Sequence, residues 1–87
     1  METGSEETMT RFIATFYSQY GAVQFQKFAR KHHIECKLAP VPRALSSSCG
    51  TCAHYTSDTW DIGFVKKDLE AIYEATKDGY MTIFSDE

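Results

Sequence analysis

The sequence predicts an α+β domain with the ferredoxin-like βαββαβ arrangement, a two-layer sandwich in which two helices cover one face of an antiparallel sheet. Two segments with helical spacing of apolar residues alternate with four short segments typical of strands, in the order strand, helix, strand, strand, helix, strand. The chain has 87 residues, which is enough for one domain and too few for a two-lobed enzyme. Its hydrophobic content of 43%, with 14% aromatic residues, supplies a core and argues against disorder.

The first two elements are a strand and a helix. Residues 11–17 alternate with apolar groups on both faces, which indicates a central strand. Ser18 follows directly and is a suitable N-cap. We therefore expect an amphipathic helix over residues 19–32, where apolar side chains recur at steps of three and four: Ala22, Phe25, Phe28 and Ala29.

Two strands separated by a loop come next. Residues 35–41 form the second strand, and Pro40 and Pro42 end it because proline cannot donate to a sheet ladder. A loop is predicted over residues 43–50 by composition. Residues 51–56 have enough β-branched and aromatic character for a third short strand.

The last two elements are predicted as a helix and a strand. A polar turn containing Trp60 precedes residues 65–76, whose apolar residues again follow helical spacing. Asp78-Gly79 would end this helix. Residues 80–84 then form the last strand.

Three parts of the chain are expected: a disordered N-terminal segment at residues 1–10, a single domain at 11–84 and an acidic tail at 85–87. The three cysteines are an odd number, and the acidic start of the chain is unlike a secretory signal, so we expect free thiols and a cytoplasmic protein. No apolar run approaches the roughly 18 residues of a membrane span. The net charge of -3 argues against nucleic-acid binding.

The segment that carries chemistry is Ser46-Ser47-Ser48-Cys49-Gly50-Thr51-Cys52. Two thiols at this spacing can form a disulfide, share a metal, or act as attacking and resolving thiols, and the spacing alone chooses none of these. The serines and Gly50 leave little side-chain bulk near Cys49 and leave backbone N–H groups to face an anionic sulfur. Arg43 and His54 add positive charge nearby, which would favour the reactive thiolate.

Two alternatives stay open for the cysteine pair. A structural zinc site needs four ligands, commonly two pairs, and only one pair is present here, so no metal and no cofactor are predicted; a metal, if bound, would use Cys49, Cys52 and His54. A thioredoxin-like dithiol would open a long helix after a strand, whereas here a loop precedes the pair and a strand follows it. Cys36 lies in the alternating pattern of the second strand and is expected to be a buried, inert thiol.

Three segments resemble the small selenium/sulfur carrier-like family of bacterial and archaeal domains: residues 12–18, residues 37–43 with the Pro-x-Pro-Arg ending, and residues 45–50 with Ser-Cys-Gly. The resemblance implies a cytoplasmic carrier in selenium or sulfur trafficking. By position, Cys49 matches the thiol of the Ser-Cys-Gly motif, with Gly50 and Arg43 as its neighbours.

Together these observations predict a non-catalytic carrier rather than an enzyme. A persulfide or selenopersulfide would form on Cys49, Cys52 would protect or discharge it, and the thiol would be supported by Arg43, Ser48, Gly50 and His54. The expected partners are a sulfur- or selenium-donor enzyme and an acceptor protein, without nucleic acid or membrane, and a homodimer stays open. A thiol-disulfide protein using Cys49 and Cys52, or a metal- or partner-binding module, is the alternative.

Overall fold

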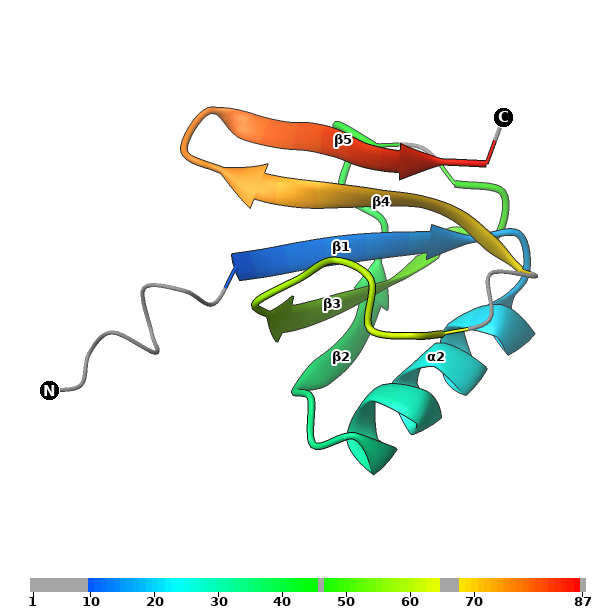
Figure 1. Cartoon of the computed structure of the whole chain (residues 1–87). Coiled ribbons are helices and arrows are strands. Elements are labelled where there is room, and N and C mark those ends of the chain that lie inside the picture. Colours follow the sequence, from blue (N-terminus) through cyan, green and yellow to red (C-terminus); the bar gives the residue numbers. More distant parts are fainter. Residues whose placement is uncertain (1–9, 46, 65–67, 87) are drawn as a thin grey trace, which may run out of the picture.

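The computed structural model describes residues 10–45, 47–64 and 68–86 (Figure 1). These residues form one five-stranded antiparallel sheet and one helix. In chain order, the elements are β1 (Thr10–Phe16), α2 (Gln19–Lys31), β2 (Cys36–Pro40), β3 (Thr51–Ser57), β4 (Leu69–Thr76) and β5 (Gly79–Ser85). The order across the sheet is β2-β3-β1-β4-β5, and each neighbouring pair is antiparallel. The segment predicted to be disordered falls outside the described residues except for its last residue, Thr10, which begins β1.

The predicted ferredoxin-like fold with two helices is wrong. The segment expected as the second helix, residues 65–76, instead contains β4, which pairs with β1 on one side and β5 on the other. Leu69, Ala71 and Ile72 are all buried, because both faces of the sheet are covered where this strand begins. A strand that is buried on both faces loses its alternating pattern, and the remaining apolar spacing then imitates a helix.

The other predicted elements are confirmed within one or two residues. Ser18 is the N-cap of α2, where the Gly21 N–H donates to the Ser18 Oγ at 3.2 Å. The C-cap is His32, and His33 then takes a left-handed φ of 61° that turns the chain toward β2. A tight turn at Lys77 and Asp78 joins β4 to β5; Gly79 begins β5 there with a φ of 142°, which favours glycine.

The core lies between the sheet and α2. Phe12 and Phe16 of β1, Tyr55 of β3 and Ile72 of β4 face the helix, where Phe25 is 1% exposed. The Phe25 ring lies 5.4 Å from that of Phe16 and 5.0 Å from that of Tyr55, centroid to centroid. These aromatic contacts hold the helix over the first three strands.

The connection between β3 and β4 takes the place of the missing second helix. Figure 1 shows this yellow-green segment passing over the same side of the sheet as α2. Phe64 packs its ring against those of Phe16, Phe25 and Phe28. Trp60 stacks on Phe84 of β5, with ring centroids 5.6 Å apart, and the Tyr55 hydroxyl donates to the Trp60 carbonyl at 2.7 Å. Residues 58–64 of the connection therefore close the core without forming a helix or strand.

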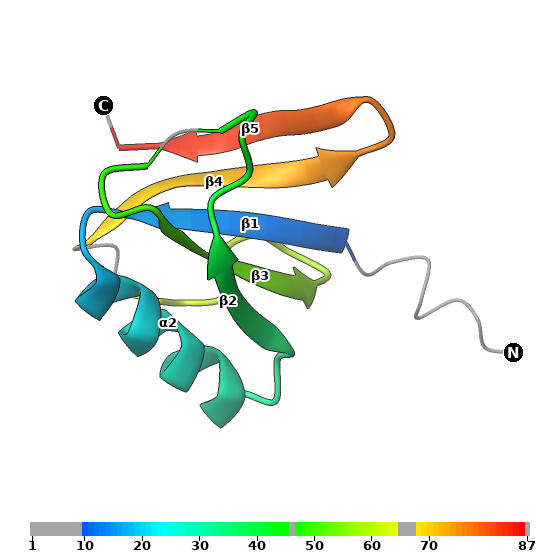
Figure 2. The same cartoon turned by 180° about the vertical axis from the view of Figure 1, so that it is seen from behind.

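The connection between β2 and β3 crosses the opposite face of the sheet. In Figure 2 this green segment passes in front of β1 and β4 before it returns to β3. It carries the motif that the sequence singled out and brings it to the end of the sheet, where Cys49 packs against the core cluster. Among the described residues, no helix has both the length and the apolar character needed to span a membrane.

Candidate functional site

The cysteine loop, defined here as the connection at residues 41–50, is closed and anchored by backbone groups. The Val41 N–H donates to the Gly50 carbonyl at 3.1 Å, which closes the loop at its base. The Ser47 hydroxyl donates to the Phe16 carbonyl at 3.1 Å, which fixes the loop to the end of β1. This end of the sheet, on the right in Figure 1, is also where β3, β4 and α2 begin.

A carboxylate of β4 provides a second anchor. The Ser48 backbone N–H donates to one oxygen of Glu70 at 3.1 Å, and the Ser48 hydroxyl donates to the other at 3.2 Å. Both oxygens of a single carboxylate thus bind one residue of the loop. The predicted binding residue Ser48 is therefore directed at Glu70, and the serine that approaches the Cys49 sulfur is Ser47.

The Cys49 sulfur lies among polar groups of its own segment. Its Sγ donates to the Thr51 carbonyl at 3.3 Å and accepts from the Thr51 N–H at 3.4 Å, and the Ser47 Oγ lies 3.9 Å away. The side chain is partly exposed and packs on one side against the core cluster. When the thiol loses its proton, the Thr51 N–H is available as a donor to the anionic sulfur, while the single Ser47 hydroxyl proton is directed at the Phe16 carbonyl.

Gly50 gives the loop its shape and leaves the space beside Cys49 open. It has a φ of 76°, a left-handed conformation that side chains rarely adopt. A Cβ built at this position would meet no atom within 4 Å. Gly50 thus forms an exposed turn directly after Cys49.

The other two cysteines are in different surroundings. Cys52 is fully buried in β3, and its Sγ donates to the Pro40 carbonyl at 3.7 Å. Burial, and secondarily the nearby Cys49, raises the pKa of Cys52 to about 11. Cys36 is buried in β2, as the sequence predicts, and burial raises its pKa to about 11 as well, against the opposing effect of Arg30. All three thiols are free.

Arg43 and His54 are the two predicted cationic neighbours of the sulfur, and neither makes a hydrogen bond to it among the residues that the structure describes. Arg43 is exposed in the turn closed by the Leu45 N–H and the Pro42 carbonyl, and no hydrogen bond joins it to Cys49 within the described part of the chain. His54 lines a depression on the sheet with Arg11 and Lys37. Its pKa is lowered by burial first and then by these two cations. Within the described residues, the group that donates to Cys49 is the neutral Thr51 N–H.

The cysteines, histidines and carboxylates that the structure describes form no group of three or more able to hold a metal ion. Cys49, Cys52 and His54, the possible metal ligands named from the sequence, do not form such a group. Cys52 turns its sulfur to Pro40, while His54 faces the depression shared with Arg11.

A family model described as "Putative Se/S carrier protein-like" matches residues 11–80. The chain belongs to this family. The match covers the cysteine loop and every strand except most of β5, so the family description applies to the part of the chain that builds the site. Searches of curated proteins and of solved structures gave no match.

Glu70 and the backbone carbonyls of Phe16 and Gly50 were not identified from the sequence as anchors of the loop. Glu70 was part of a predicted helix, on which it would have been an ordinary exposed acid. The sequence nevertheless contains one indication of this contact. A carboxylate next to the start of a strand is a suitable acceptor for the N–H and hydroxyl groups of a serine-rich loop. The backbone anchors have no sequence signature.

Proposed function

We propose that this member of the family carries selenium or sulfur as a persulfide or selenopersulfide on Cys49. The observation that carries the proposal is the difference among the three thiols. Cys49 alone among them reaches the surface, beside an open turn, whereas Cys36 and Cys52 are buried with a raised pKa. The thiolate is the form that attacks electrophilic sulfur, so the buried thiols are poor acceptors.

The transfer step is a thiol exchange at the sulfane sulfur or selenium. The Cys49 thiolate attacks the outer atom of a donor persulfide, R–S–SH, or selenopersulfide, R–S–SeH. A bond forms between the Cys49 sulfur and that atom, the donor's S–S or S–Se bond breaks, and the donor leaves as the thiolate R–S⁻. The product is Cys49–S–SH or Cys49–S–SeH, and no external oxidant or reductant is needed. An acceptor thiolate discharges the adduct by the same exchange.

The loop supplies what this exchange needs from a carrier. The Thr51 N–H stabilises negative charge on the sulfur, while the anchors at Phe16 and Glu70 keep the loop in place as a donor protein approaches. Four depressions on the described residues are lined by other residues than Cys49, which lies instead beside the exposed turn at Gly50. An open thiol suits exchange between two protein partners.

The test is mass spectrometry of the reduced protein after incubation with a low-molecular-weight persulfide or selenopersulfide. We expect one added sulfur or selenium atom on Cys49, no adduct on the Cys49→Ser variant, and an undiminished adduct on the matched Cys52→Ser variant. Failure of the wild-type protein to take up an atom, or uptake that survives in Cys49→Ser, contradicts the proposal. If oxidation instead gives a Cys49–Cys52 disulfide that blocks loading, the dithiol alternative replaces it.

A further inference from the structure

A cationic depression lies on the face of the sheet opposite the helix. It has a volume of about 430 Å³ and is lined by residues of β1, β2 and β3, among them Arg11, Lys37 and His54. Lys37 and His54 are direct cross-strand partners, and Ile13 is the partner of His54 on the other side. Since side chains opposite one another in an antiparallel pair point to the same face, these residues and Arg11, two positions from Ile13, share one face.

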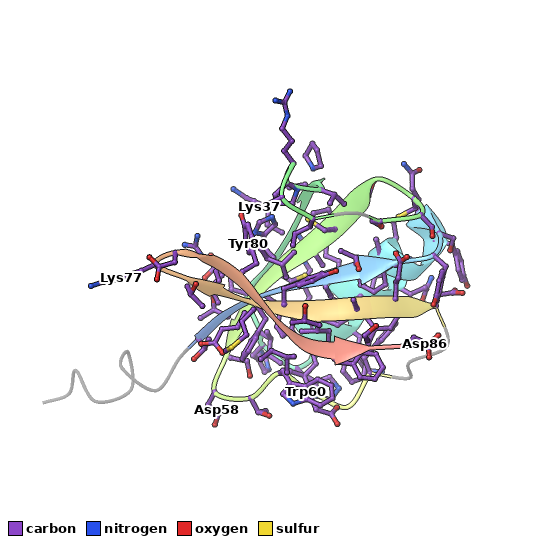
Figure 3. The ribbon with its side chains drawn as sticks, turned by 90° about the horizontal axis from the view of Figure 1, so that it is seen from above. Lys37, Asp58, Trp60, Lys77, Tyr80 and Asp86 are labelled. Carbon is purple, nitrogen blue, oxygen red and sulfur yellow. The ribbon has the colours of Figure 1, made fainter. Side chains whose placement is uncertain are left out.

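Two observations place this face away from the core. Phe12 and Cys36, which alternate with residues of the depression along their strands, belong to the core cluster under α2. Tyr55 lines the depression but also belongs to that cluster and is 1% exposed. Figure 3 shows Lys37 on the opposite side of the sheet from Trp60, which belongs to the core side. The depression is therefore separate from the core and open to solvent.

The positive charge of this depression is not neutralised within the described residues. Neither Arg11 nor Lys37 makes an ion pair there, although Glu35 also lines the rim and Thr56 adds a hydroxyl. The pKa of His54 is lowered by burial and by Arg11 and Lys37, so the two cations are close enough to act on the ring. Two cations against the one carboxylate of Glu35 leave the depression with a net positive charge, which attracts anions.

We infer that this depression binds a tetrahedral oxyanion, a phosphate or sulfate group, between Arg11, Lys37 and His54. The guanidinium offers a planar pair of donors to two oxygens, the ammonium of Lys37 offers a compact charge, and the imidazole offers one ring N–H. The volume lies within the range of small-molecule sites, so the anion fits either free or as the phosphate of a small ester.

This site is independent of the proposed carrier function. His54 lies three residues along β3 from Thr51, whose backbone binds the Cys49 sulfur, which is about 10 Å along a strand. The Cys49 side chain also packs against the core cluster, and the depression is on the other face. Loss of one activity should leave the other intact.

The test follows backbone and His54 ring signals by nuclear magnetic resonance while sodium sulfate is added, against sodium chloride at matched ionic strength. Sulfate keeps its charge across the pH range in which His54 titrates, so changes report binding alone. We expect saturable shifts at Arg11, Lys37 and His54 and an upward move of the His54 pKa, because the anion offsets the repulsion from the two cations. Inorganic phosphate and glycerol phosphate, compared in the same way, distinguish a free anion from an ester.

Variants complete the test. Lys37→Ala and Arg11→Ala, both at exposed positions, should each weaken sulfate binding by roughly fivefold or more. Lys77→Ala removes the same charge from the turn between β4 and β5, which Figure 3 shows at the edge of the molecule, and should leave binding unchanged. Shifts that follow ionic strength equally in sulfate and chloride, or a Lys77→Ala variant that weakens binding as much as Lys37→Ala, overturn the inference.

Discussion

The surroundings of the three cysteines predict a large difference in their reactivity in the folded protein. Under native, reducing conditions, iodoacetamide should label Cys49 and leave Cys36 and Cys52 unmodified. Cys52 is 0% exposed and Cys36 is 9% exposed, whereas Cys49 lies beside the open turn at Gly50. The reagent therefore has a path to one sulfur and not to the other two.

The magnitude follows from the pKa of the buried thiols. A pKa of about 11 in place of the ordinary 9.0 reduces the thiolate fraction near neutral pH by roughly 100-fold. Alkylation requires the thiolate, so Cys36 and Cys52 should react at least about 100-fold more slowly than an ordinary exposed thiol. The restricted access of the reagent to these two sulfurs would slow the reaction further. Their rates should continue to rise with pH up to about 11.

The assay is time-resolved peptide mass spectrometry after quenching, kept below pH 9. Ionisation of the buried thiols does not destabilise the folded protein in this range. A thiol with a raised pKa in the folded state lowers stability only when the pH rises from its pKa in the unfolded chain toward its pKa in the folded protein. Protein labelled in denaturant serves as the control and should be modified at all three sites. Comparable native rates at Cys49 and Cys52 would refute the reasoning, and so would a native rate at Cys49 as low as that of Cys36.

Three further changes test the packing around the site. Glu70→Gln should weaken the anchor of the loop and speed exchange of the Ser48 amide hydrogen severalfold, with little change in stability because the contact is exposed; unchanged exchange would mean that the carboxylate does not hold the loop. Tyr55→Phe should lower the free energy of unfolding by about 1 to 2 kcal/mol, since a carbonyl of the β3–β4 connection loses its donor, and denaturant melting measures this. Gly21→Ala should destabilise the protein although alanine favours helices, because the added Cβ would lie 2.6 Å from the Asp68 Cβ, and a raised melting temperature would contradict this.

The sequence predicts the first four elements of the fold well because each has a local physical signal. The strand at β1 shows apolar residues on both faces, Ser18 caps the helix, and Pro40 and Pro42 end the strand at β2. The error begins at Leu69, where burial on both faces of β4 removes the alternation that identifies a strand. The structure of β4 is decided by its pairing with β1 and β5, which is a tertiary interaction that the local sequence does not show.

The candidate site divides in the same way. The small residues around Cys49 are its neighbours in the sequence, so a loop can be predicted there from the sequence alone. The structure places that thiol at a partly exposed turn. The positions of His54 and Arg43 depend on strand register and loop path, and the register places His54 beside Lys37 in the depression. Glu70 and the Phe16 carbonyl come from distant parts of the chain and meet the loop only after the sheet forms.

The place of β4 in the sheet has a consequence for synthesis of the protein. β1, near the start of the chain, has β3 on one side and β4 on the other, so a nascent chain that stops at residue 64 leaves β1 as an unpaired edge. Exposed edges of this kind recruit other strands. Completion of the sheet therefore waits until β4 has left the ribosome, and the anchor that Glu70 gives the cysteine loop forms only then.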